Sequence, residues 1–285
     1  MKILSLLLLP IILLFGCSSS NDANKNVILV SAPPYVEIVQ ELVGDLATVK
    51  SILADNQNIH FFEPRPKEMA KFANAAIWFG VGESFEKKIL PSLKQKGKIT
   101  YINLSKQIPL IHSSSNHCHG HGHHHEHLFD LHIWMSPQLM MKQVEVMKTA
   151  LINWQPDKIG EIEANAQQVM FKLQKLNAEI LQRLAPYKGN VILVGHPSLG
   201  YFCNTYDLIQ YSIECDGKTP SPRDIEHLLR KLKHNEIRCA FAQPQFDERA
   251  LKKIANDMTI PIYMVDPNSK HYYQTVLQVA DDITQ

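Results

Sequence analysis

Short runs of β-branched and other apolar residues alternate along the chain with stretches whose apolar residues recur every three or four positions. The apolar runs predict strands, and the spacing of three and four predicts amphipathic helices. Strands are expected in the first half at Val27–Ser31, Thr48–Leu53, Ala75–Val81 and Thr100–Leu104, with helices at Tyr35–Val43, Pro66–Asn74 and Ser84–Lys96. Such an alternation predicts a parallel sheet covered by helices on both faces.

A long helical pattern occupies the middle of the chain. Ser136 and Pro137 are typical of a helix cap and a first helical turn, so a helix is expected from there to about Asn153. From Asp157 to Ala185 the apolar residues continue at steps of three and four. This pattern predicts a single helix of about 29 residues, roughly 43 Å long. Such a length exceeds what one small lobe needs.

The alternation of strands and helices then restarts. Strands are expected at Val191–Val194, Leu208–Glu214, Arg238–Phe241 and Pro261–Val265, and helices at Pro222–Lys233, Phe246–Asn256 and His271–Asp282. We therefore expect an α/β fold with two four-stranded lobes, residues 27–156 and 187–285, joined by one long rigid helix at 157–186. In open α/β sheets the loops after the strands face the ligand crevice, so a ligand is expected in the cleft between the lobes.

The first residues have the order of a secretory signal. Lys2 precedes an apolar run that ends at Phe15, and this run is shorter than the roughly 20 residues that span a bilayer. Residues 14–17 resemble a bacterial lipobox, in which Cys17 is lipidated and begins the mature chain. The alternative is a plain signal peptide cut near Ser20. We expect an exported lipoprotein, periplasmic or on the cell surface, whose lipid on Cys17 anchors it to a membrane and whose residues 17–26 form a polar tether.

Composition and charge add limits to this picture. The chain has 285 residues, 45% of them hydrophobic, which is enough for a sizeable core. Without residues 1–16, whose one charged residue is Lys2, 28 of the 29 basic residues and all 28 acidic residues remain. This balance gives no reason to expect nucleic acid as a partner. Export allows a disulfide between two of Cys203, Cys215 and Cys239; the alternative is buried free thiols.

A histidine-rich tract indicates metal chemistry. Eight of the fourteen histidines lie between Asn116 and Pro137, and imidazole is a common ligand of transition metals. Secondary metal binding is expected in a solvated loop at 112–127, by His117, His119, His121, His123, His124, His125 and His127. His132 differs because Leu131, Ile133 and Trp134 surround it with apolar sequence. We expect His132 in a folded wall, as part of a tighter site.

Three other isolated candidates also follow predicted strands. They are His60, His196 and Asp266, and with His132 they give two candidates from each lobe. Three imidazoles and a carboxylate form a tetrahedral set that suits zinc. Taken singly, each has another explanation: a hydrogen-bonded core histidine, a turn or a helix cap. Glu63 and Asp130 are expected to orient a ligating imidazole from its far side; their alternatives are helix entry and turn formation.

Several segments resemble a known family. The segments HFFEPRP, DLHIWMSP, VGHPSLGYF, SPRDIEHLLRKLK and FAQPQFDERALKKIA are similar to motifs of the TroA-like, or ZnuA-like, metal receptors of bacterial ABC importers. The resemblance covers nearly the whole mature chain. It implies two α/β lobes joined by a rigid helix, a metal bound between them, and the membrane subunits of an ABC permease as partners; we expect a monomer.

The resemblance also bears on the choice of metal. It places ligands at positions matching His60, His132, His196 and, more variably, Asp266. Manganese receptors of this family usually have glutamate in place of His196, so Zn²⁺ is favoured over Mn²⁺. Some zinc receptors have a glutamate just before the first ligand, where this chain has Ile59. The fourth position then falls to Asp266 or to a water.

We therefore predict a protein that captures zinc and delivers it to a permease, without catalysis. Two alternatives are kept. One is a secreted zinc hydrolase, which the absence of HExxH and GxSxG motifs disfavours. The other is a metal-buffering or adhesive surface lipoprotein in which the histidine tract is the working part.

Overall fold

The computed structural model describes residues 26–54, 57–72, 74–96, 98–112, 129–214 and 220–285. The expectations for the signal peptide, Cys17, the tether up to residue 25, the histidines at 117–127 and Cys215 lie outside this part of the chain. Within it, no helix combines the length and the apolar character that crossing a membrane requires.

The first lobe is built on a parallel sheet in the strand order β2-β1-β3-β4. Its strands are β1 (Asn26–Val30), β2 (Ala47–Ser51), β3 (Ile77–Gly80) and β4 (Thr100–Asn103), and its helices are α1 (Tyr35–Val43), α2 (Pro66–Phe72) and α3 (Ser84–Lys96). Val30 is aligned with Ser51 on one side and with Phe79 on the other. All residues of β3 are buried, as expected of an inner strand covered on both faces.

The second lobe repeats this arrangement in the order β6-β5-β7-β8, again with parallel pairing. Its strands are β5 (Val191–Val194), β6 (Ile209–Ser212), β7 (Ile237–Ala242) and β8 (Ile262–Met264). The helices are α6 (Gly200–Thr205), α7 (Pro222–Leu232), α8 (Arg249–Met258) and α9 (Tyr272–Thr284). The short helix α6 was not expected from the apolar pattern.

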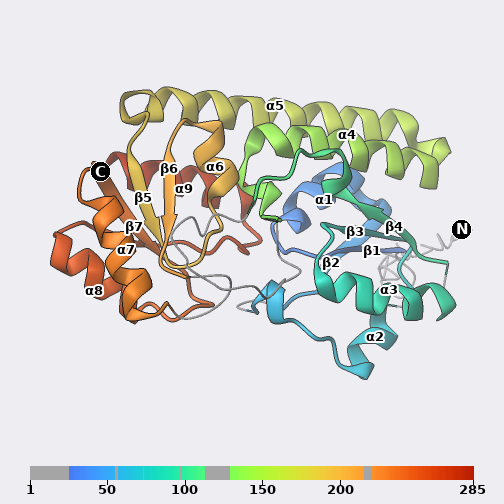
Figure 1. The fold of residues 1–285 in the computed structure, drawn as a ribbon. Coiled ribbons are helices and arrows are strands. Elements are labelled where there is room, and N and C mark those ends of the chain that lie inside the picture. The colour runs from blue at the N-terminus through green and yellow to red at the C-terminus, as the bar shows by residue number, and fades with distance from the viewer. Residues whose placement is uncertain (1–25, 55–56, 73, 97, 113–128, 215–219) are drawn as a thin grey trace, which may run out of the picture.

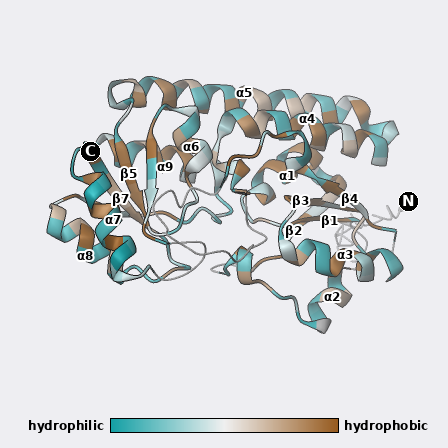
Figure 2. Ribbon diagram, viewed as in Figure 1, coloured by the Kyte–Doolittle hydropathy of each residue, from teal (hydrophilic) through white to brown (hydrophobic). Residues whose placement is uncertain are grey.

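Two long helices run side by side along one flank of the molecule. They are α4 (Pro137–Trp154) and α5 (Ile159–Leu184), and α5 extends over both lobes (Figure 1). The helix α5 has 26 residues and is shorter than expected, because 3₁₀ turns at Pro156–Lys158 and Ala185–Tyr187 replace its ends. Polar and apolar residues alternate along it (Figure 2), and those facing the protein are Ile162, Ala166, Val169, Leu173, Leu176, Ile180 and Leu184.

One hydrophobic core joins the two lobes. It includes Phe79 of the first sheet, Leu173 of α5 and Phe241 of the second sheet, all fully buried. A second, smaller cluster lies in the second lobe and includes Leu228 of α7 and Ile254 of α8. The expected fold class, two four-stranded α/β lobes joined by a long helix, is confirmed.

Two of the second lobe's cysteines are buried free thiols, Cys203 on α6 and Cys239 on β7. Burial raises the pKa of both thiols, that of Cys239 to about 12. Of the two alternatives for the cysteines, buried free thiols is the one observed for this pair.

Candidate metal centre

The site residues come from the loops that follow the strands. His60 follows β2, His132 follows β4 after a longer connection, and His196 lies two residues after the last residue of β5. The carboxyl ends of parallel strands meet at one edge of each sheet. This is how residues far apart in the sequence reach the same place between the lobes.

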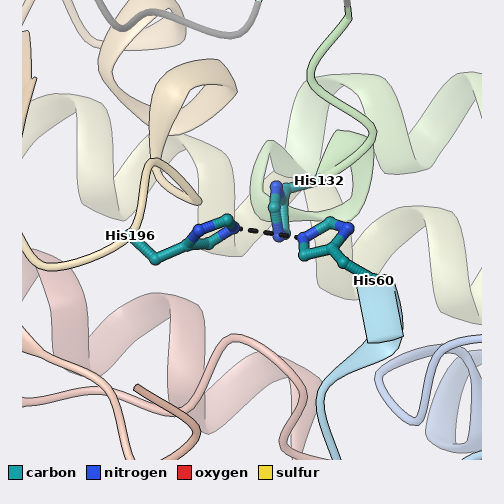
Figure 3. A group of neighbouring side chains, drawn as sticks. All are labelled: His60, His132 and His196. Atoms are coloured by element: carbon teal, nitrogen blue, oxygen red, sulfur yellow. Dashed lines mark hydrogen bonds between the residues drawn. The ribbon is translucent and has the colours of Figure 1, made fainter. Parts of the chain in front are cut away.

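His60, His132 and His196 form a compact group in which one ring nitrogen from each lies within 4.8 Å of the others. Figure 3 shows the three imidazoles turned toward one another, with a dashed line that joins His60 and His196 and with His132 beside it. The Nε2 atoms of His60 and His196 are 3.1 Å apart. Ring centroids are separated by 4.9 to 5.3 Å.

His60 lies in a 3₁₀ turn, Ile59–Phe61. The side chain of Asn58 accepts a hydrogen bond from the backbone N–H of His60 at 2.9 Å and so fixes the start of the turn. The Nδ1 atom of His60 is 3.3 Å from Oε1 of Glu83, a carboxylate that is completely buried just after β3.

His132 precedes a second 3₁₀ turn, Ile133–Met135. Oδ1 of Asp130 accepts from the backbone N–H of His132 at 2.8 Å and lies 2.7 Å from its Nδ1. Both residues are buried. The expectation that His132 belongs to a folded wall and that Asp130 lies beside its ring agrees with these contacts.

His196 is held by three neighbours. Its Nδ1 is 2.6 Å from Oε2 of Glu214, which follows β6. The amide of Gln243, which follows β7, accepts from the backbone N–H of His196 at 2.7 Å and donates to its carbonyl at 3.0 Å. The ring of Phe246 stacks on the imidazole at 4.2 Å, with 8° between the planes.

Each histidine therefore has a carboxylate on its Nδ1. A carboxylate accepts the Nδ1 proton, which leaves the lone pair on Nε2. Two Nε2 lone pairs that face each other at 3.1 Å, as in His60 and His196, repel unless a proton or a metal cation lies between them. Zinc–nitrogen bonds of 2.0–2.1 Å in a tetrahedron separate the nitrogens by about 3.3 Å. The arrangement fits a small, nitrogen-preferring cation.

The environment of His60 changes its acid–base behaviour. Burial lowers the pKa of its imidazole, whereas the charge of Glu83 and its contact with the ring, together with the charges of Asp130 and Glu214, raise it. The net effect is a pKa above the ordinary 6.5. In the metal-free protein a proton therefore competes with a metal for Nε2 of His60 over a wider pH range than at an ordinary histidine.

Two residues selected from the sequence are not members of the histidine group. Glu63 is an exposed residue that pairs with Lys88 at 3.0 Å, and the carboxylate beside His60 is Glu83, so the role expected of Glu63 is corrected. Asp266 is not a member of the histidine group. Its Oδ1 accepts instead from the side chain of Gln245 and from the backbone of Asn268.

The pocket around the histidines is small. Besides them, Gln243, Gln245, Phe246 and Asn268 are among the residues that line it, and its volume is about 10 Å³. This volume admits an ion or a single water, since a cavity that holds one water needs roughly 10–15 Å³. An organic substrate does not fit.

Four of these residues were not identified from the sequence. Glu83, Glu214, Gln243 and Gln245 all follow strands, as the histidines do. Their position was therefore a usable signal. Their chemistry was not, because carboxylates and amides are common in loops and their histidine partners lie far away in the sequence.

Known proteins of similar sequence include zinc-binding and zinc-uptake proteins. A family model described as "ZnuA: Zinc-uptake complex component A periplasmic" matches residues 28–285. The zinc-binding lipoprotein AdcA of Streptococcus pneumoniae is 30% identical over 91% of this chain, which spans about half (53%) of that longer protein. The high-affinity zinc uptake system protein ZnuA of Bacillus subtilis is 25% identical over 86% of this chain and 78% of its own length.

A solved structure has a similar fold. The crystal structure of a ZnuA superimposes with a TM-score of 0.82 at 27% identity, and the match covers 92% of this chain and 98% of the other. The family model alone covers nearly all of the described residues. The chain belongs to the ZnuA family of zinc-uptake components.

Proposed function

We propose that this protein is an extracytoplasmic receptor that binds Zn²⁺ between its two lobes and delivers it to the membrane subunits of an ABC-type permease. The observation that carries the proposal is the convergence of three imidazoles, each with a carboxylate on the nitrogen that faces away from the group. Membership of the ZnuA family supports both the ion and the transport role.

The residues of the site have two different roles in metal binding. His60, His132 and His196 supply neutral nitrogen ligands, which suit zinc better than manganese. Glu83, Asp130 and Glu214 hold each ring in the tautomer that presents Nε2. Their negative charges also favour a dication in this small pocket.

The proposal includes export and anchoring. Residues 1–16 act as a signal peptide, and a lipid on Cys17 holds the mature protein at a membrane. The lipobox-like sequence supports this, and the similar AdcA is described as a lipoprotein. The histidines at 117–127 provide a secondary, weaker metal-binding segment.

The alternatives have less support. A hydrolase needs room for its substrate beside the metal, and the pocket leaves space for an ion or one water. A buffering or adhesive lipoprotein in which the histidine tract does the work leaves the arrangement of three histidine–carboxylate pairs unexplained.

Titration calorimetry with Zn²⁺ tests the proposal. Deleting residues 116–127 is expected to leave one tight site per protein. His132→Ala and His196→Ala remove a ligand and are expected to weaken that site on the order of 100-fold or more. His234→Ala, an exposed histidine in the turn after α7, is the matched control and should bind as the natural protein does.

The opposite pattern would contradict the proposal. If the deletion abolished tight binding while both alanine variants kept it, the histidine tract would be the working part. The buffering alternative would then describe the protein better.

A further inference from the structure

Two residues of the histidine pocket each have a buried amide oxygen that accepts no hydrogen bond from the described residues. Oε1 of Gln245 and Oδ1 of Asn268 each expose less than 1 Å², and neither accepts a hydrogen bond within the described part of the chain. Both residues line the same small pocket as His60, His132 and His196. A buried acceptor without a donor is costly and rare in native proteins, so a ligand that brings donors is the natural explanation.

Asp266 holds the side chain of Gln245 and the backbone of Asn268. Its Oδ1 accepts from Nε2 of Gln245 at 2.7 Å and from the backbone N–H of Asn268 at 2.9 Å. Because the Gln245 amide nitrogen is directed at Asp266, its oxygen is directed away from Asp266. Asp266 itself is not among the residues that line the pocket. Its carboxylate is used to position its two neighbours.

We infer that a water molecule completes the coordination of the bound zinc and donates its two O–H groups to Gln245 and Asn268, and that Asp266 is a positioning residue for these amides. The inference rests on the proposed function, since it assumes that zinc is the ion. It chooses between the two candidates for the fourth position, Asp266 and water.

The donors of a zinc-bound water match the acceptors of Gln245 and Asn268 in number. A water bound to zinc through its oxygen has two protons to donate, and the pocket offers two acceptors. Amide oxygens are neutral and weak ligands for zinc compared with imidazole, thiolate or carboxylate, so they accept from the water and do not replace it. The pocket is small, which agrees with a fourth ligand no larger than a water.

Zinc affinity and stability together distinguish this arrangement from a role in supporting the fold. No donor from the described residues reaches either oxygen, so replacing one by an apolar group breaks no hydrogen bond of the fold. Such a variant should bind zinc more weakly while the metal-free protein becomes no less stable. A residue that only supports the fold would show a loss of stability.

Asn268 is the better residue to change, because the hydrogen bond to Asp266 uses its backbone and survives substitution. In the full-length protein, Asn268→Leu is expected to weaken zinc binding about 10- to 100-fold, measured by competition with a chelator. Asn268→Asp keeps an acceptor and should retain the affinity. Thermal unfolding of metal-free Asn268→Leu should occur at the same temperature as in the natural protein or higher. Asn204→Leu, an exposed residue of α6, is the matched control for both measurements.

Asp266→Asn distinguishes a positioning residue from a ligand. The asparagine oxygen can still accept from Gln245 and Asn268, so zinc affinity should stay within about tenfold. A crystal structure of the zinc-loaded protein should show a water as fourth ligand, within hydrogen-bond distance of both amide oxygens.

Three results would overturn the inference. In the first, Asp266→Asn weakens zinc binding more than about 100-fold or the crystal structure shows its carboxylate on the metal; in the second, Asn268→Leu leaves zinc affinity unchanged; in the third, it destabilises the metal-free protein. The zinc receptor function would survive each of them. If the natural protein lacked a tight zinc site, the proposed function itself would fail, and the inference with it.

Discussion

Each histidine of the candidate site is paired with a carboxylate from its own lobe, and each pair uses Nδ1. Glu83, which follows β3, contacts His60, and Asp130 contacts His132 from two positions away. Glu214, which follows β6, contacts His196. Without such a partner an imidazole distributes its proton between two nitrogens. The pairs therefore preorganise three Nε2 lone pairs before an ion arrives.

Glu214→Gln tests this role at a single residue. A glutamine can still accept the Nδ1 proton of His196 but carries no charge, so the imidazole becomes a weaker ligand. Zinc affinity measured by calorimetry is expected to fall about tenfold, with one ion still bound. Glu63→Gln is the control, because Glu63 is exposed and pairs with Lys88. Equal affinities for the two variants would mean that the charge of Glu214 does not matter.

The raised pKa of His60 predicts opposite pH dependences for the stability of the metal-free protein and for its affinity for zinc. In the metal-free form, charged His60 stabilises the fold fully below its unfolded pKa of about 6.5. This contribution is lost as pH rises through the higher folded pKa. Zinc must displace the same proton, so its affinity should rise over this range, by up to about tenfold per pH unit.

Chelator competition and thermal unfolding between about pH 6 and pH 9 measure both slopes. Glu83→Gln removes the largest of the contributions that raise the pKa of His60. In this variant both slopes should become shallower above about pH 6.5. Slopes identical to those of the natural protein would show that another group controls the pH dependence.

At the scale of elements, the first turn of α6 is packed closely against the residue that holds His132. A Cβ atom added to Gly200 would lie 2.7 Å from Oδ2 of Asp130 and 3.0 Å from Ile111. The next residue, Tyr201, donates from its hydroxyl to the carbonyl of Asp130 at 2.8 Å. The second lobe thus contacts the backbone and side chain that position a histidine of the first lobe.

Gly200→Ala is expected to displace Asp130 and to lower both the stability and the zinc affinity. Overpacking of this kind costs about 1–3 kcal/mol, and the zinc affinity should fall about tenfold or more because Asp130 orients His132. Gly160→Ala is the control: no atom lies within 4 Å of its added Cβ, and alanine favours the helix α5. Chemical denaturation and calorimetry on both variants give the comparison. Unchanged zinc affinity in Gly200→Ala would exclude the coupling.

Most elements could be predicted from the sequence because their patterns are local. The strand β5 and the helices α1 and α3 have the expected bounds. The helix α6 was missed, since six residues are too few to show a helical period. The same limit applies to the site: His60, His132 and His196 were identified by their isolation after strands, whereas Glu83 and Glu214 became recognisable only when the fold brought them to their histidines.

At the scale of the whole molecule, the two lobes share a core and several direct contacts. The indole N–H of Trp134 in the first lobe donates to the carbonyl of Pro267 in the second at 2.8 Å, in a buried position. Tyr273 of α9 donates to Glu41 of α1 at 3.1 Å, and Lys172 of α5 pairs with the same carboxylate at 2.7 Å. A wide hinge motion would have to break these contacts and expose part of the shared core.

We therefore expect zinc release without wide opening. The radius of gyration from small-angle X-ray scattering should be the same within error for the zinc-loaded protein, for the protein after chelation, and after zinc is restored. Hydrogen exchange should show α5 amides near Leu173, which is fully buried, protected to the level of global unfolding in both forms. Changes in protection should be confined to the loops after the strands, such as those holding His60 and Gln245. A radius that rises on chelation together with faster exchange in α5 would mean that the lobes separate, and that the helix does not hold them together.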